Sequence, residues 1–118
     1  MTEELEKYVL SHSAPEGDYL YRLYRATNIH TIHGRMASGH LQGRLLKMVV
    51  EMIRPKNILE VGTFSGYSAI CMAEGLAEIA KSTEAHANGA SMASAAEGDD
   101  KEAGVSKVWT FEINDEME

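Results

Sequence analysis

An acidic residue followed by two glycines marks the part of this chain best suited to chemistry. The stretch from Asn57 to Ser68 opens on a short apolar run and carries Glu60 just ahead of Gly62 and Gly66. The apolar run predicts a buried strand, and Tyr67–Leu76 predicts a helix. Gly62 would let a ligand lie across the backbone, and Gly66 would let the helix begin close to the strand. A strand, bend and helix of this kind aim backbone N–H groups at a ligand.

A second acidic residue, Glu112, ends an alternating run that predicts another strand from Lys107. In nucleotide-binding α/β folds an acid at this place accepts hydrogen bonds from ribose hydroxyls. An ionised carboxylate suits that role because it only accepts, and it can take two donors. The spacing from Glu60 exceeds the usual gap of about 20 residues, and the intervening segment 81–106 accounts for the excess. A solvated acid at the end of a strand is the alternative.

The string Glu-Val-Gly-Thr-Phe-Ser-Gly-Tyr-Ser at 60–68 resembles motif I of class I S-adenosylmethionine-dependent methyltransferases. It is most similar to the catechol and caffeoyl-CoA O-methyltransferase-like family. The resemblance implies an α/β, Rossmann-like fold, of which this chain would be the N-terminal part: helices, strand, helix and strand, with an incomplete sheet. A nicotinamide-dependent dehydrogenase is poorly supported, because its Gly-x-Gly-x-x-Gly spacing is not met.

The resemblance also implies which residues bind the cofactor. A segment that begins at Met36 and precedes Gln42-Gly43 would form one wall of the pocket, as a similar segment does in the family. No catalytic or metal-binding residue is assigned, because the family's metal carboxylates and catalytic lysine come from later strands. The implied cofactor-binding residues are Met36, Ser38, Glu60, Gly62, Thr63, Ser68 and Glu112.

The implied function is methyl transfer from S-adenosyl-L-methionine to a hydroxyl of a small catechol-like acceptor, with this chain supplying the cofactor-binding half. The full-length protein would use a divalent cation, Mg or Ca, whose ligands are not in this chain. A hydroxylated uridine in tRNA stays open as another acceptor. The resemblance implies a homodimer with the N-terminal helices contributing. The alternative function is an inactive or binding-only fragment without methyl transfer.

Residues 1–118 are expected to form a single N-terminal portion of a methyltransferase domain. Residues 1–56 would be a helical cap and pocket wall, with helices at Thr2–Leu10, from an Asp18 cap onward, and at Leu41–Ile53. Residues 57–80 would form the strand, bend and helix. Residues 81–106, poor in bulky apolar side chains, predict a flexible insertion with a helical turn at 92–97. Residues 107–118 would be the second strand and the start of another helix.

Two helix faces are also predicted. The periodicity of the third helix predicts an apolar stripe that faces a sheet. Thr2 is expected to cap the first helix. In the helix after the bend, one side is expected to face inward. The stripe consists of Leu45, Leu46, Val49, Met52 and Ile53, and the inward side of Ala69, Ile70, Ala73, Leu76, Ala77 and Ala80.

Composition limits the other function classes. The 118 residues carry a net charge of −7, which disfavours nonspecific binding of RNA or anionic membranes. No apolar run approaches the roughly 20 residues of a membrane span, and the N-terminus lacks a signal peptide pattern. The single Cys71 favours a reduced, cytoplasmic setting. Three histidines, His30, His33 and His40, allow a zinc hypothesis, but loop imidazoles are the favoured interpretation.

Overall fold

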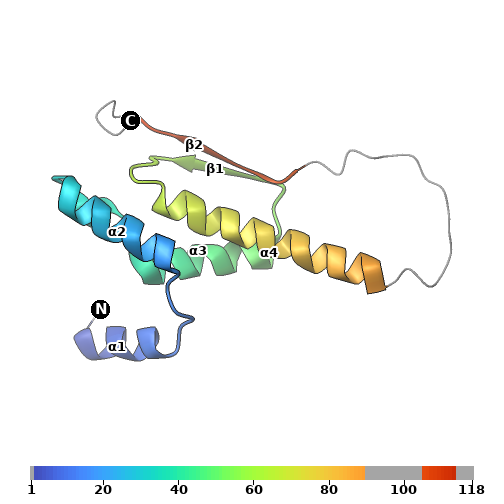
Figure 1. The fold of residues 1–118 in the computed structure, drawn as a ribbon, viewed down its shortest axis with the longest axis horizontal. Coiled ribbons are helices and arrows are strands. Elements are labelled where there is room, and N and C mark those ends of the chain that lie inside the picture. Colours follow the sequence, from blue (N-terminus) through green and yellow to red (C-terminus); the bar gives the residue numbers. More distant parts are fainter. Residues whose placement is uncertain (1, 90–104, 114–118) are drawn as a thin grey trace.

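The computed structural model describes residues 2–89 and 105–113, and its elements alternate from helices to strand, helix and strand (Figure 1). This order confirms the predicted α/β class. The elements are α1 (Glu3–Ser11), α2 (Asp18–His30), the 3-10 turn η1 (Gly34–Met36), α3 (Gly39–Ile53), β1 (Asn57–Val61), α4 (Tyr67–Gly89) and β2 (Lys107–Phe111).

The two strands are parallel neighbours in a small sheet. Their register pairs Asn57 with Lys107 and Val61 with Phe111. The pairing continues past the end of β1, where the N–H of Gly62 donates to the carbonyl of Phe111 at 2.8 Å. Both strands therefore end at the same edge, and the residues that follow them meet there. Within the described residues the sheet has two strands, as expected for an incomplete sheet.

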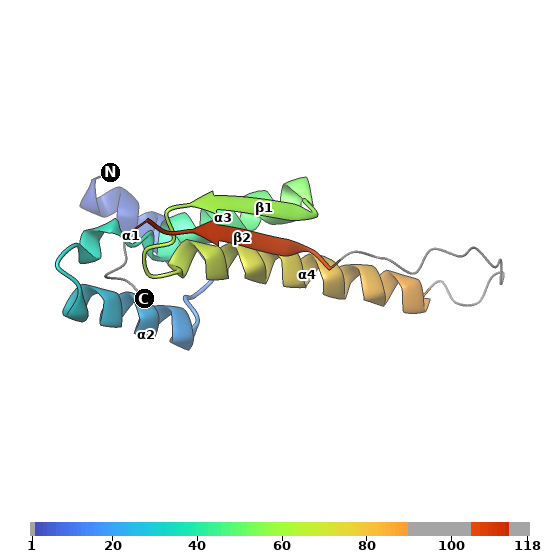
Figure 2. The ribbon, with the colours of Figure 1, turned by 90° about the horizontal axis from the view of Figure 1, so that it is seen from above.

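The helices α3 and α4 lie together on one face of the sheet, with β1 above α3 and β2 above α4 (Figure 2). The core between these layers contains Val50 of α3 and Met72 and Leu76 of α4, packed against Ile58 and Val108 of the strands. The opposite face of the sheet is apolar and open. It carries the exposed side chains of Leu59, Val61, Trp109 and Phe111.

The third helix packs on α4 through a face that the sequence did not predict. Gly43 and Val50 are the buried residues of α3, whereas the predicted stripe is largely exposed. Of that stripe, only Leu46 packs against the core. The prediction was wrong because α3 lies against the helix rather than under further strands. Its exposed members are Leu45, Val49, Met52 and Ile53.

Small residues explain the close contact between α3 and α4. A Cβ placed on Gly43 would lie 2.6 Å from the sulfur of Cys71, and one on Gly75 would lie 3.0 Å from Val50 Cγ1. The predicted inward side of α4 is correct at Leu76 and at the partly buried Ile70. It is wrong at three exposed alanines, since Cys71, Met72 and Gly75 occupy the interface instead. The exposed alanines are Ala73, Ala77 and Ala80.

Several predicted boundaries also change. The helix α4 continues to Gly89, so residues 81–89 are helical and not part of a flexible insertion. An established helix extends with one hydrogen bond for each residue added, and Arg54 Nη2, at the C-cap of α3, donates to the hydroxyl of Thr83 at 3.4 Å. The remainder of the insertion, with the turn expected at 92–97, and the helix expected at 114–118 lie outside the described residues.

The expected helix caps are only partly present. Thr2 stands at the N-cap of α1 but makes no side-chain cap hydrogen bond. Asp18 is the first helical residue of α2, and Gly17 is its N-cap, so the predicted Asp18 cap is wrong. An acid in the first turn still interacts favourably with the positive end of the helix dipole. Across residues 2–89 and 105–113 no helix has the length and hydropathy to cross a membrane.

Candidate functional site

The bend between β1 and α4 is built from backbone conformations that favour glycine. Gly62 has φ +93° and Gly66 has φ +78°, and between them Phe64 also takes a positive φ of 49°. The N–H of Gly66 closes the turn by donating to the carbonyl of Thr63 at 2.9 Å. Apart from its own chain neighbours, a Cβ on either glycine would meet no atom of the described residues within 4 Å. Positive φ, rather than the expected close approach of helix and strand, therefore requires Gly66.

Glu112 reaches this bend from the end of β2. Its Oε2 accepts a hydrogen bond of 2.6 Å from the N–H of Phe64, and its Oε1 accepts one of 2.7 Å from the N–H of Ile113. Glu112, the second predicted acid, thus lies beside the predicted bend between β1 and α4. Parallel pairing of the strands brings Glu112 and the bend together, because the bend follows the end of β1 and Glu112 follows the end of β2.

Glu60 points to the helix side of the sheet and is buried, with 9% of its surface exposed. Its two carboxylate oxygens accept hydrogen bonds from the hydroxyls of Ser68, at 2.5 Å, and Thr110, at 2.7 Å. The hydroxyl of Thr110 also hydrogen-bonds that of Thr63. Ser68, one of the expected cofactor-binding residues, therefore bonds Glu60. Sequence reasoning missed Thr110, because the strand register that places it opposite Glu60 cannot be read from the sequence.

A cavity of about 60 Å³ lies between the bend and the segment after α2. It brings together five of the seven predicted cofactor-binding residues, Met36, Ser38, Gly62, Thr63 and Ser68. The other two adjoin it: Glu60 holds Ser68, and Glu112 holds Phe64, which also lines the cavity. Small-molecule sites usually enclose about 300–1,000 Å³, so this cavity is one part of such a site.

Tyr67, the first residue of α4, also lines the cavity. Sequence reasoning missed this residue. Its side chain is 2% exposed, its hydroxyl donates to Glu16, and its ring meets that of Tyr24 edge-on. Burial raises the pKa of Tyr67 well above its ordinary value, and the hydrogen bond to Glu16 adds to the shift. The tyrosine therefore stays neutral and anchors the bend to α2.

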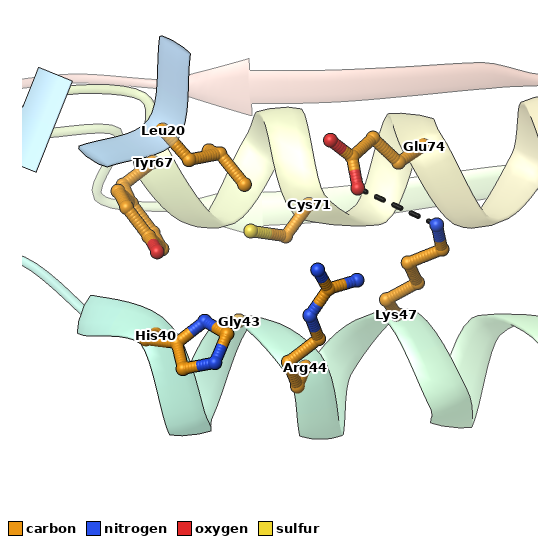
Figure 3. A pocket seen from close by; sticks show the side chains of 8 residues that line it. All are labelled: Leu20, His40, Gly43, Arg44, Lys47, Tyr67, Cys71 and Glu74. Atoms are coloured by element: carbon orange, nitrogen blue, oxygen red, sulfur yellow. Dashed lines mark hydrogen bonds and ion pairs between the residues drawn. The ribbon is translucent and has the colours of Figure 1, made fainter. Parts of the chain in front are cut away.

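Below Tyr67 the interface of α2, α3 and α4 is closed. The side chains that meet there, among them Leu20, Arg44 and Glu74, leave no room for a molecule of the size of water, so this region is no ligand site (Figure 3). Lys47 Nζ of α3 and Glu74 Oε2 of α4 form an ion pair at 3.5 Å that links the two helices. Burial raises the pKa of Glu74, and the charge of Glu78 raises it further. Burial also raises the pKa of Cys71, against the opposing effect of Arg44.

Metal ligands are not grouped in the described ranges. Residues 2–89 and 105–113 contain no set of three or more His, Cys, Asp or Glu side chains arranged to hold an ion. His30 ends α2, and His33 precedes the 3-10 turn. The geometry at these histidines therefore offers nothing in favour of the zinc hypothesis.

Comparison with known proteins places the geometry in context. The model of the O-methyltransferase family matches residues 10–117. The caffeoyl-CoA O-methyltransferase of Stellaria longipes is 31% identical over 98% of this chain and 48% of its own length. A protein of Arabidopsis thaliana named probable caffeoyl-CoA O-methyltransferase is 35% identical over 68% of this chain and 35% of its own length.

A solved structure is also similar. The SAH-bound Podospora anserina methyltransferase PaMTH1 superposes with a TM-score of 0.59 at 25% identity, over 98% of this chain and 52% of that protein. The chain thus spans about half the length, or less, of the relatives that it matches.

Proposed function

The chain belongs to the O-methyltransferase family, and from this we propose that it is the cofactor-binding half of an S-adenosylmethionine-dependent O-methyltransferase. One observation carries the proposal. The acid that ends β2 and the glycine bend that follows β1 are in direct contact, through the 2.6 Å bond between Glu112 and Phe64. A ribose hydroxyl held by Glu112 would then lie beside the bend, where the rest of the cofactor would be bound.

The proposed roles of the residues follow from their positions. Glu112 would accept hydrogen bonds from the ribose hydroxyls, since an ionised carboxylate takes two donors. Thr63 and the backbone of Gly62 would contact the cofactor at the bend, and Met36 and Ser38 would form the facing wall. Glu60 and Ser68, which hydrogen-bond each other, would hold the bend in place from its buried side. When bound, S-adenosylmethionine supplies a methyl group on a sulfonium, which a hydroxyl oxygen of the acceptor can take.

The acceptor that we propose is a small molecule with a catechol-like hydroxyl. The S. longipes relative is named for caffeoyl-CoA, which is consistent with a phenolic acceptor. A hydroxylated uridine in tRNA is a second candidate, and the net charge of −7 counts against it. The described residues do not fit a divalent cation. If the reaction uses Mg or Ca, we propose that the ligands of the ion lie in a region that corresponds to the part of the relatives that this chain does not match.

We also propose a cytoplasmic homodimer. Support for association comes from apolar and aromatic side chains that are exposed on α1 and α2, among them Leu5, Tyr8, Tyr19 and Tyr21. Apolar and aromatic side chains exposed in this way are available for contact with a second subunit. For the domain organisation we propose that residues 1–118 are a single N-terminal portion of a methyltransferase domain, with residues 1–56 as helical cap and pocket wall.

Calorimetric titration of the chain with S-adenosylhomocysteine and, separately, with NAD tests the proposal. Binding of S-adenosylhomocysteine without NAD binding is expected. Binding of NAD alone would exclude a methyltransferase cofactor site. The alternative is a binding-only or inactive fragment without methyl transfer. An assay of methyl transfer to a catechol separates the two when this chain is compared with the same chain extended by the part of the S. longipes relative that it does not match. Turnover by the extended protein supports the methyltransferase, and cofactor binding without turnover in both supports the binding-only alternative.

A further inference from the structure

Thr110 of β2 occupies a central place in the hydroxyl network behind the bend. Its Cα is paired with that of Glu60 in the strand register, and its hydroxyl donates to Glu60 Oε2 at 2.7 Å. The hydroxyl oxygen of Thr110 also hydrogen-bonds the hydroxyl of Thr63, which lines the cavity. Thr110 therefore connects the buried carboxylate to a side chain at the candidate site, although it is not one of the cavity-lining residues.

The direction of each proton in this network follows from the count of donors. A threonine hydroxyl has one proton, and an ionised carboxylate has none to give. Since Thr110 donates its proton to Glu60, the bond between the two threonines must be donated by Thr63. The hydroxyl of Thr63 then has only lone pairs left to offer to the cavity.

We propose that Thr110 is a positioning residue of the cofactor site. It holds the carboxylate of Glu60 in place, and it turns the hydroxyl of Thr63 so that this group accepts a hydrogen bond from a donor of the ligand. The proposal rests on the proposed function, because it assigns the ligand of Thr63 to the cofactor. Its structural part, the bracing of the bend, stands on the hydrogen bonds alone.

Two substitutions separate the hydroxyl from the side-chain shape. Thr110→Val keeps a β-branched side chain, which suits a strand, and removes the hydroxyl. Thr110→Ser keeps the hydroxyl and removes the methyl group. If the hydroxyl is what positions the site, the serine variant should behave like the wild type and the valine variant should not.

The first measurement is the affinity for S-adenosylhomocysteine, obtained by calorimetry. Thr110→Val is expected to bind about tenfold more weakly, the scale of a hydrogen bond to a charged group, and Thr110→Ser within about twofold of the wild type. Thr63→Val should weaken the wild type but add little to Thr110→Val, because the two hydroxyls act through one another. Equal losses in the serine and valine variants, or fully additive losses with Thr63→Val, would overturn the proposal.

The second measurement does not need the cofactor to bind. Amide hydrogen exchange at Gly62–Ser68 should become faster in Thr110→Val and stay unchanged in Thr110→Ser, after correction for global stability measured in urea. If wild-type protein binds no S-adenosylhomocysteine, the proposed function fails, and this exchange difference still decides whether Thr110 braces the bend. Equal exchange in both variants would show that it does not.

Discussion

The carboxylate of Glu112 accepts a 2.6 Å hydrogen bond from the backbone N–H of Phe64, a residue 48 positions earlier in the chain. Phe64 itself has a positive φ of 49°, which a non-glycine residue rarely adopts, so this bond stabilises an unusual turn. Glu112 is thus engaged with the bend before any cofactor arrives. A ligand that uses the same carboxylate has to share it or replace this bond.

Removal of this carboxylate should weaken cofactor binding. Glu112→Ala is expected to reduce the affinity for S-adenosylhomocysteine by about 1.5–3 kcal/mol, the scale of hydrogen bonds to a charged group. Calorimetric titration of wild type and variant measures the change. Glu6→Ala, which removes an exposed acid from α1, is the matched control and should bind like the wild type. An unchanged affinity in Glu112→Ala would remove Glu112 from the proposed site.

The sequence was sufficient to predict the bend and its two acids, because these depend on local chemistry. Glycine is favoured where φ is positive, and a short apolar run that ends at such a glycine is typical of a strand followed by a bend. The meeting of Glu112 with the bend followed from one further rule, that parallel strands end at the same edge. Met36 and Ser38, placed by family resemblance, do line the same cavity as the bend.

Other features depend on partners that are distant in the sequence. The apolar residues of α3 occupy more than one side of the helix, so periodicity alone could not tell which side α4 would cover. Val50 is buried because Gly75 of α4 leaves room for it, a match that no local pattern reveals. Thr110 depends in the same way on the strand register, which fixes Glu60 as its partner. Segment 81–89 was misassigned because a helix that has already formed extends at little cost into the next residues, even where these lack bulky apolar side chains.

Substitutions at Gly66 should depend on backbone conformation rather than on size. Its φ of +78° is unfavourable for a β-branched residue, whereas asparagine tolerates such angles. Gly66→Val is expected to lower the free energy of unfolding by about 1–2 kcal/mol, and Gly66→Asn by clearly less. Urea denaturation of both variants measures this. Equal losses would mean that crowding matters here, in conflict with the open space around Gly66.

Gly43 should not tolerate even a methyl group. A Cβ there would lie 2.6 Å from Cys71 Sγ and 2.9 Å from Tyr67 Cε1, inside contact distance. Overpacking of a core usually costs about 1–3 kcal/mol, and we expect Gly43→Ala to fall in this range in urea denaturation. Cys71→Ala in the same protein removes the sulfur and should recover part of the loss. No recovery would show that the contact with Cys71 is not what limits this position.

The thiol of Cys71 should react slowly in the folded chain. It is 3% exposed, and burial raises its pKa, so little reactive thiolate is accessible. Because the chain has a single cysteine, labelling with Ellman's reagent reports on this residue alone. The rate at neutral pH should rise strongly when urea unfolds the protein. Equal rates in the folded and unfolded chain would contradict the closed interface of α2, α3 and α4.

The partly buried carboxyl group of Glu74 gives the stability of the chain a dependence on pH. Burial, and then the charge of Glu78, raise the pKa of Glu74 above its ordinary value of 4.5. The folded chain therefore holds this proton more tightly than the unfolded chain. The contribution of the group to the free energy of unfolding is fully present below pH 4.5 and is lost as the pH rises through the folded pKa.

Wild-type protein should accordingly lose stability relative to Glu74→Gln as the pH rises from 4.5 toward neutrality, because the glutamine does not ionise. Urea denaturation of both proteins at several pH values measures the difference. Glu84→Gln, at an exposed position on the same helix, is the control for the loss of one acidic side chain from α4. A wild type that gains relative stability with pH would show the opposite balance. In that case the attraction of Lys47 at 3.5 Å would outweigh the burial of the carboxylate.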